Sequence, residues 1–211
     1  MIVIQPLVCG AYGENAYLVY ERDRKDLLLI DPGDDLPAIE RAIRQSGRTP
    51  ADILLTHGHF DHILAVAPLR EKYGARVHIH PLDAYMLLSA GASMMNAAVC
   101  RLPFVPVRAD APYPQGERFE LTACGLTFEG IHTPGHTPGG VCLLLPAAGA
   151  AFTGDTLFAE GYGRYDFPGG DWHQLKSSLR TVLALPPTYT VYAGHGDADT
   201  MANIAARWNA G

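Results

Sequence analysis

The stretch THGHFDH at residues 56–62 holds three histidines and one aspartate within seven residues. It overlaps the end of the run DILLT at residues 52–56, which is typical of a buried strand. Imidazole nitrogens and carboxylate oxygens are common ligands of divalent metals in proteins. The stretch therefore predicts a metal site at the end of a strand, to which the rest of the chain must supply further ligands.

Length and composition describe a single globular domain spanning residues 1–211. The chain is 48% hydrophobic and 18% charged, which is enough apolar material for a sizeable core. Sixteen basic against twenty-two acidic residues give a net charge of −6, and no cluster of Lys or Arg stands out. We therefore expect no nucleic acid as a partner.

The N-terminal run MIVIQPLV lacks a basic region and a long apolar segment, and no apolar run approaches the roughly 18 residues of a membrane helix. We expect a cytoplasmic protein without a membrane partner. The four cysteines show no C-x-x-C spacing, so we expect thiols rather than disulfides or zinc ligands.

Strand-like and helix-like segments alternate in the first half of the chain. The run LLLIDPG at 27–33 predicts a strand, and a helical pattern follows it until Gly47. A second such unit consists of the strand DILLT and a helix over 62–74. Short β-rich runs occupy about 115–158, before a helix near 172–183 and a last strand at 188–195. This order indicates sheets covered by helices, with residues 91–114 as a loop near a substrate opening.

Possible metal ligands stand where the predicted strands end. His57 and His59 follow one strand, Asp155 follows a second, and His195 ends a third. His136 lies in the Gly- and Pro-rich stretch HTPGHTPGG. Because packed strands finish on a common rim, these side chains are expected to converge on one metal centre.

These residues resemble the metallo-β-lactamase fold hydrolases, whose H-x-H-x-D-H signature matches residues 57–62. Further matches follow in the family's order: Asp31 in DPG, His136 in GHTPG, Asp155 in TGDT and His195 in GHG. The resemblance covers nearly the whole chain. It implies an α/β fold, an αββα sandwich of two mixed β-sheets packed face to face, with helices on the outer faces and two metals at one edge.

The resemblance also implies a role for each ligand. The first metal would be held by His57, His59 and His136, the second by Asp61, His62 and His195, with Asp155 as the bridge. Asp31 is expected to orient an imidazole through its other nitrogen. A turn-forming role of Asp31 before Pro32 and Gly33 is an equal alternative.

Residues 153–171 are most similar to the short glyoxalase II-like (hydroxyacylglutathione hydrolase-like) thioesterases and to persulfide dioxygenases. Lactamases commonly carry a cysteine at the position of Asp155, which argues against β-lactam hydrolysis. About sixteen residues follow His195, so we expect no separate C-terminal glutathione-binding domain.

The resulting expectation is a dinuclear hydrolase that cleaves a thioester, such as S-lactoylglutathione, by attack of a metal-bridging hydroxide. Zn is the expected metal, with Fe or Mn as alternatives. Asp61 is expected to relay a proton. Arg164 and Tyr165 are expected to bind substrate, because a guanidinium pairs with carboxylates through two hydrogen bonds.

Two other functions remain open at this point. A mononuclear iron persulfide dioxygenase would use only His57, His136 and Asp155. A metal-stabilised binding module without turnover is disfavoured because the ligand set is complete. The remaining histidines are expected to be structural or exposed, and no carboxylate is expected within reach of His78 and His80. The oligomeric state is not predicted.

Overall fold

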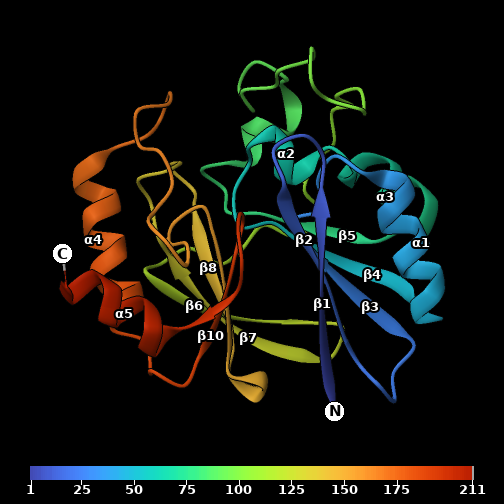
Figure 1. Ribbon diagram of the computed structural model, residues 1–211. Helices are drawn as coiled ribbons and strands as arrows, with labels where there is room; N and C mark the ends of the chain where they lie inside the picture. The colour runs from blue at the N-terminus through green and yellow to red at the C-terminus, as the bar shows by residue number, and fades with distance from the viewer. Residues whose placement is uncertain (211) are drawn as a thin grey trace.

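The first of two mixed sheets is built from the N-terminal half of the chain. The computed structural model describes residues 1–210, and this sheet has the order β1-β2-β3-β4-β5 (Figure 1). Strands β1, β2 and β3 pair antiparallel, whereas β3, β4 and β5 pair parallel. The bounds are β1 Ile2–Cys9, β2 Glu14–Glu21, β3 Asp26–Ile30, β4 Thr49–Leu54 and β5 Arg76–His78.

The second sheet has the order β11-β10-β9-β8-β7-β6. Its one parallel pair joins β9 and β10, and its other pairs are antiparallel. The bounds are β6 Arg118–Ala123, β7 Leu126–His132, β8 Val141–Leu145, β9 Ala150–Gly154, β10 Thr190–Ala193 and β11 Asp199–Thr200.

Helices cover the outer face of each sheet. In Figure 1 α1 and α3 lie beside the first sheet, and α4 and α5 lie beside the second. The helices are α1 Leu36–Ser46, α2 Phe60–Ile63, α3 Val66–Tyr73, α4 Trp172–Leu183 and α5 Met201–Ala210, with 3-10 turns at Ala84–Leu88 and Pro146–Ala148. The predicted αββα sandwich is therefore confirmed.

Alternation along the strands divides the core into layers. In β3, Leu28 and Ile30 face the second sheet and pack in one cluster with Phe128 and Phe152. Leu27 and Leu29 face the other way, into the cluster under α1 and α3. Successive side chains of a strand point to opposite faces, so a run that is apolar throughout suits a sheet buried on both sides.

Several predicted elements have different limits in the structure. The helix ending at Gly47 is confirmed, with Gly47 in the left-handed region at φ 67°. The single helix predicted over 62–74 is wrong, because the chain forms α2 and α3 with a break between them. The hairpin β1–β2 was not predicted. Strand β1 lies at a sheet edge and contains Pro6, which edge strands tolerate but which weakens the strand pattern.

None of the helices in the described chain has the length and apolar character required to cross a bilayer. All four cysteines are thiols without a disulfide partner, as predicted.

A buried carboxylate ties β4 to β5 and to the turn between β6 and β7. Asp52 is 1% exposed and accepts hydrogen bonds from His78 Nε2 at 2.8 Å, Arg76 Nε at 3.0 Å and the Cys124 amide at 3.0 Å. The expectation that no carboxylate lies within reach of His78 is therefore wrong. Burial opposes ionisation of Asp52, but these hydrogen bonds, led by the one from His78, hold its pKa below its usual value.

We predict that Asp52→Asn lowers the free energy of unfolding by about 1.5–3 kcal/mol at pH 7, because hydrogen bonds to a charged group are lost. A carboxyl with a lowered folded-state pKa stabilises the fold above its unfolded pKa of about 3.9 and loses that contribution as pH falls further. The difference in the free energy of unfolding between wild type and variant should therefore become smaller below about pH 4. Urea denaturation of both proteins at several pH values, with chelator present, measures this difference.

The matched control is Asp26→Asn, which removes an exposed ion pair with Arg24. Its effect should stay within about 1 kcal/mol. If the loss in the free energy of unfolding caused by Asp52→Asn does not change with pH, Asp52 acts through packing rather than through its charge.

Candidate metal centre

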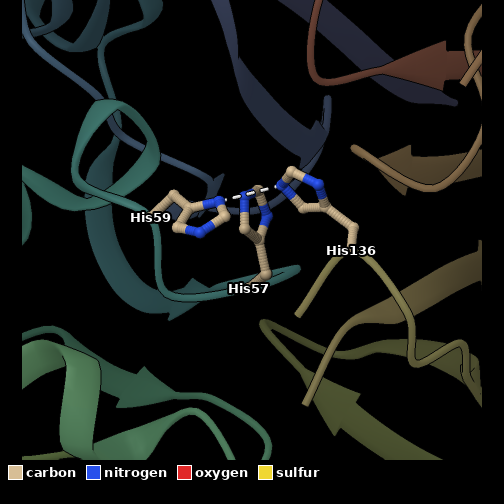
Figure 2. A group of neighbouring side chains, drawn as sticks. All are labelled: His57, His59 and His136. Carbon is tan, nitrogen blue, oxygen red and sulfur yellow. Dashed lines mark hydrogen bonds between the residues drawn. The ribbon is translucent and has the colours of Figure 1, made fainter. Parts of the chain in front are cut away.

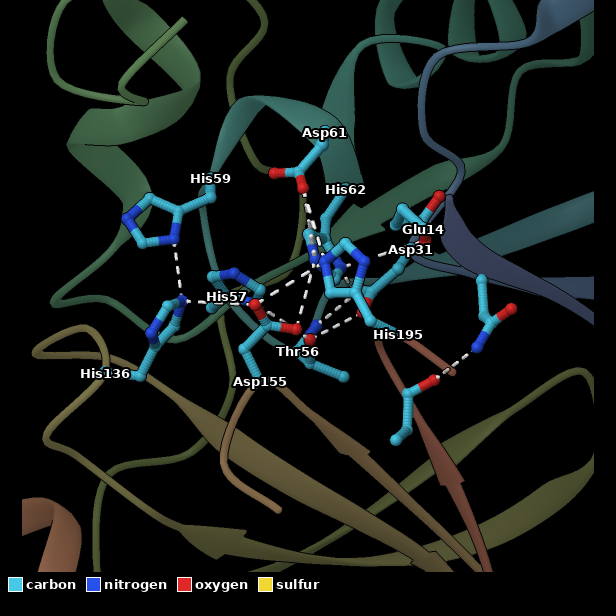
Figure 3. Close-up of polar contacts among 12 residues, drawn as sticks. Glu14, Asp31, Thr56, His57, His59, Asp61, His62, His136, Asp155 and His195 are labelled. Atoms are coloured by element: carbon cyan, nitrogen blue, oxygen red, sulfur yellow. Dashed lines mark hydrogen bonds and ion pairs between the residues drawn. The ribbon is translucent and has the colours of Figure 1, made fainter. Parts of the chain in front are cut away.

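The predicted ligands converge at one edge of the sandwich, from both sheets (Figure 3). His57 and His59 follow β4 of the first sheet. Asp155 and His195 follow β9 and β10 of the second sheet, and His136 lies in the loop between β7 and β8. The parallel pairing of β9 with β10 brings the ends of these two strands side by side.

The first ligand group consists of three buried histidines, His57, His59 and His136 (Figure 2). One nitrogen from each ring lies within 4.8 Å of the others. His59 Nδ1 and His136 Nε2 face each other at 2.8 Å. Three converging imidazoles of this kind match the donor set that holds zinc and iron in proteins.

The second ligand group consists of Asp61, His62 and His195. Asp61 Oδ2 lies 3.4 Å from His195 Nε2 and 4.0 Å from His62 Nε2. Asp61 and His195 are partly exposed, whereas His62 is fully buried. This side of the centre therefore opens towards solvent.

Asp155 lies between the two groups and contacts members of both. Its Oδ1 is 3.4 Å from His62 Nε2, and its Oδ2 is 3.5 Å from His136 Nε2 and 3.6 Å from His195 Nε2. The structure therefore places Asp155 where a shared ligand would be required.

Oxygen atoms outside the centre orient four of the five imidazoles. His136 Nδ1 donates to the Arg164 carbonyl at 2.5 Å, and His195 Nδ1 donates to the Tyr12 carbonyl at 3.2 Å. A carbonyl oxygen only accepts, so Nδ1 carries the proton in both rings. His57 Nδ1 lies 3.1 Å from Thr56 Oγ1. In these three rings Nε2 is left facing the centre, which is the nitrogen that a metal ion would bind.

Asp31 orients the fourth of these rings, His62. Its Oδ2 lies 3.1 Å from His62 Nδ1, and it also accepts from the amide of Thr56 at 2.7 Å and from Thr56 Oγ1 at 2.5 Å. Its backbone is left-handed, with φ 47°. The structure therefore supports the interpretation of Asp31 as a residue that orients an imidazole, and its left-handed backbone follows the end of β3 before Pro32.

Sequence reasoning missed Glu14, a second carboxylate behind His62. Glu14 is 1% exposed, its Oε1 lies 3.8 Å from His62 Nδ1, and neither of its oxygens has a hydrogen-bond partner in the described structure. Burial raises the pKa of Glu14 well above its usual value. The signal in the sequence was a charged residue two positions before the apolar residues of β2.

Asp83 was also missed, and it holds the loop that carries His136. This fully buried carboxylate accepts from Thr137 Oγ1 at 2.7 Å and from the Gly139 amide at 2.6 Å. Its position follows the short strand β5, far from the loop in sequence. A lone aspartate two residues after Pro81 gave no sign of this contact.

The protonation states suit cation binding. Burial lowers the pKa of His57 far below its usual value and that of His59 to about 3, so both rings are neutral. Burial opposes ionisation of Asp61 and Asp155, but the neighbouring His62 lowers the pKa of both carboxyls. These carboxylates in turn raise the pKa of His62 against its burial, so a cation binding there displaces a proton.

Several inward-facing atoms are buried without a hydrogen-bond partner, among them His57 Nε2, His62 Nε2 and Asp155 Oδ1. Buried polar atoms are otherwise almost always paired. Because these atoms come from both ligand groups and are of the types that divalent ions bind, the residues present fit a metal centre.

A cavity of about 480 Å³ opens onto the centre. Arg164 lines this cavity, and so do Met94 and Asn96 from the predicted loop 91–114. Tyr165 does not line it and packs on Trp172 instead, with ring centroids 5.0 Å apart. Tyr162, three residues earlier, does line the cavity.

Known proteins are similar to this chain in both sequence and fold. Residues 9–195 match the model of the metallo-beta-lactamase superfamily. The chain is 34% identical to the hydroxyacylglutathione hydrolase GloC of Haemophilus influenzae over 94% of its own length and 92% of the relative.

Two crystal structures agree closely in fold. The BLEG-1 B3 metallo-beta-lactamase is 33% identical with a TM-score of 0.87, covering 95% of each chain. TTHA1623 in a di-iron-bound form is 38% identical with a TM-score of 0.83, covering 96% of this chain and 97% of that one. With a family match over most of its length and relatives above 30% identity along nearly all of it, this chain belongs to the metallo-beta-lactamase superfamily.

Proposed function

We propose that this metal-dependent hydrolase cleaves thioesters with two divalent ions, Zn being the expected metal. The observation that carries the proposal is the position of Asp155, whose two carboxylate oxygens contact His62 on one side and His136 and His195 on the other. Seven candidate donors are more than one tetrahedral ion uses. When bound, a pair of divalent ions supplies a nucleophile from water near pH 7 and polarises a carbonyl group.

The proposed roles of the residues follow from their positions. His57, His59 and His136 hold the first ion, and Asp61, His62 and His195 hold the second. Asp155 keeps the two ions together. Hydrogen bonds to backbone oxygen lock the rings of His136 and His195, so the donors need little rearrangement during a reaction.

Asp61 is the proposed proton relay. It lines the cavity, and its side chain is 15% exposed, so a carboxylate oxygen can reach a proton on the substrate side. A departing thiolate needs little help from an acid, because the pKa of a thiol is about 8.5. An amine leaving group requires a proton from a general acid, and Asp61 is a poor donor because the neighbouring His62 lowers the pKa of its carboxyl against the effect of burial. The site therefore suits thioesters better than amides.

The relatives support thioesters and define the competing substrates. GloC is a hydroxyacylglutathione hydrolase, which makes a lactoyl thioester the first substrate to test. BLEG-1 is a metallo-beta-lactamase, so a β-lactam belongs in the same panel. TTHA1623 binds two irons, so iron is an alternative to zinc. A mononuclear iron dioxygenase would leave Asp61, His62 and His195 without a function.

The first functional prediction is thiol release from S-lactoylglutathione and from the lactoyl thioester of N-acetylcysteamine. The zinc-loaded protein should cleave at least one of them, and removal of metal with chelator should lower the rate by several orders of magnitude, because the nucleophile is lost. A chromogenic cephalosporin serves as the comparison. Cleavage of the cephalosporin without cleavage of either thioester contradicts the proposal, as does oxygen consumption on glutathione persulfide as the sole activity.

The second prediction concerns stoichiometry. Elemental analysis of the saturated, dialysed protein should find two metal ions per chain, because the donors form two groups joined by Asp155. One iron per chain with no second ion would favour the dioxygenase.

The third prediction concerns Asp155 itself. Asp155→Ala should lower metal content from two ions per chain and reduce thioesterase activity by several orders of magnitude, since it contacts both groups of ligands. Asp26→Ala, which removes an exposed carboxylate, is the control and should keep both ions. Near-normal activity of Asp155→Ala would show that another residue joins the two sites.

A further inference from the structure

We propose that the cavity beside the metal centre binds an uncharged aromatic or alkyl group of the substrate rather than the carboxylates of glutathione. The inference rests on the proposed thioester hydrolysis and narrows its substrate class. It follows from two independent features of the described residues, an aromatic lining and the absence of an unpaired cation.

Aromatic side chains from separate segments form the cavity wall, together with Met94. These rings belong to Tyr12, Phe60, Phe158, Tyr162 and Phe167. Three of them lie beside the centre: Phe158 is 6.0 Å from the ring of His195, Phe167 is 5.8 Å from that of His59, and Phe60 follows His59 in sequence. An apolar group held at the metals would therefore contact several aromatic rings at once.

Tyr12 is held in place although its side chain is open to solvent. The residue is 49% exposed, and its ring packs edge-on against Phe60 with centroids 5.4 Å apart. Its hydroxyl accepts a hydrogen bond from Asn96 Nδ2 at 3.3 Å, and its carbonyl accepts one from His195. A preorganised exposed ring at a cavity mouth gains favourable contact area when an apolar group covers it.

Arg164 is the only Lys or Arg among the residues that line the cavity, and its charge is already matched. Its Nε and Nη2 donate to the two oxygens of Asp166 at 2.9 and 2.7 Å. The guanidinium also lies over the ring of Phe167, 4.2 Å from its centroid. The Nε and Nη2 donors of Arg164 and one face of its guanidinium plane are therefore occupied. Few donors of Arg164 remain for a substrate carboxylate.

The neighbouring hollow beyond His195 is acidic. Its lining includes Glu160, Asp197 and Asp199, with Arg207 as its only Lys or Arg. Arg207 donates to the Ala159 carbonyl at 2.8 Å and to Asp199 at 2.5 Å. Across both hollows, the cations found within residues 1–210 are thus paired, and an anionic thiol carrier meets carboxylates instead.

The test uses three thioesters with the same lactoyl group on different thiols: benzyl mercaptan, N-acetylcysteamine and glutathione. With the zinc-loaded enzyme we expect kcat/KM for the benzyl thioester to exceed that for N-acetylcysteamine about tenfold, from burial of one ring. Glutathione should give no advantage over N-acetylcysteamine. Preference for glutathione, or equal values for all three, overturns the inference while thioester hydrolysis stands. Hydrolysis of none of the three overturns the proposed function itself.

Variants locate the effect. Tyr12→Ala should reduce the benzyl to N-acetylcysteamine ratio of kcat/KM severalfold, whereas Tyr12→Phe, which keeps the ring, should preserve the ratio. Metal content and thermal melting confirm that each variant is folded and loaded. An unchanged ratio in both Tyr12→Ala and a second variant, Phe158→Leu, contradicts binding at this wall.

Arg164→Ala tests whether the Arg164 guanidinium is occupied by Asp166 or binds a carboxylate of the substrate. If the pairing with Asp166 occupies the guanidinium, KM for S-lactoylglutathione should change less than about twofold, as expected for loss of an exposed ion pair. A rise of about ten- to a hundredfold in KM with kcat unchanged, confined to the glutathione thioester, would mean that Arg164 binds a carboxylate, and the inference would be wrong.

Discussion

The structure depends on the burial, complete or partial, of five imidazoles and two carboxylates at one edge of the sandwich. Buried polar atoms are costly unless each has a partner, so the outer nitrogens of the rings must meet oxygen atoms. Those oxygens come from four different parts of the chain: Asp31 after β3, Thr56 after β4, Arg164 in the loop after β9 and Tyr12 in the hairpin β1–β2. The strands must therefore end where they do for any of these rings to be oriented.

Close approach of the backbone completes this arrangement. A Cβ atom at Gly194 would lie 2.3 Å from Asp155 Oδ1 and 2.7 Å from His62 Cε1, so no other residue fits at this position. The β2 strand reaches the same point from the first sheet, where the Asn15 amide donates to the Gly194 carbonyl at 2.8 Å. The two sheets are thus joined at the centre by backbone contacts as well as by the packed apolar core.

The ligand residues could be predicted because they stand in short, fixed patterns next to strong strand signals, as for His57 after DILLT. The sandwich followed from the resemblance these patterns carry. Residues that act over long sequence distances could not be predicted in this way. Asp83 meets the loop of His136 more than fifty positions away, and Glu14 lies in a hairpin whose edge strand contains Pro6. Arg164 and Asp166 are only two residues apart, but whether their side chains pair depends on how the loop folds.

The hydrogen bond between Tyr12 and His195 joins residues 183 positions apart. This separation has a consequence for synthesis, during which a chain emerges N-terminus first at about 5–20 residues per second. His136, the last of the three histidines to be made, precedes His195 by 59 residues, so the three-histidine group is available about 3–12 s earlier. The second group cannot close until the end of the chain has met its beginning. A nascent chain therefore passes through a stage in which the three histidines of the first group have been made and His195 of the second group has not.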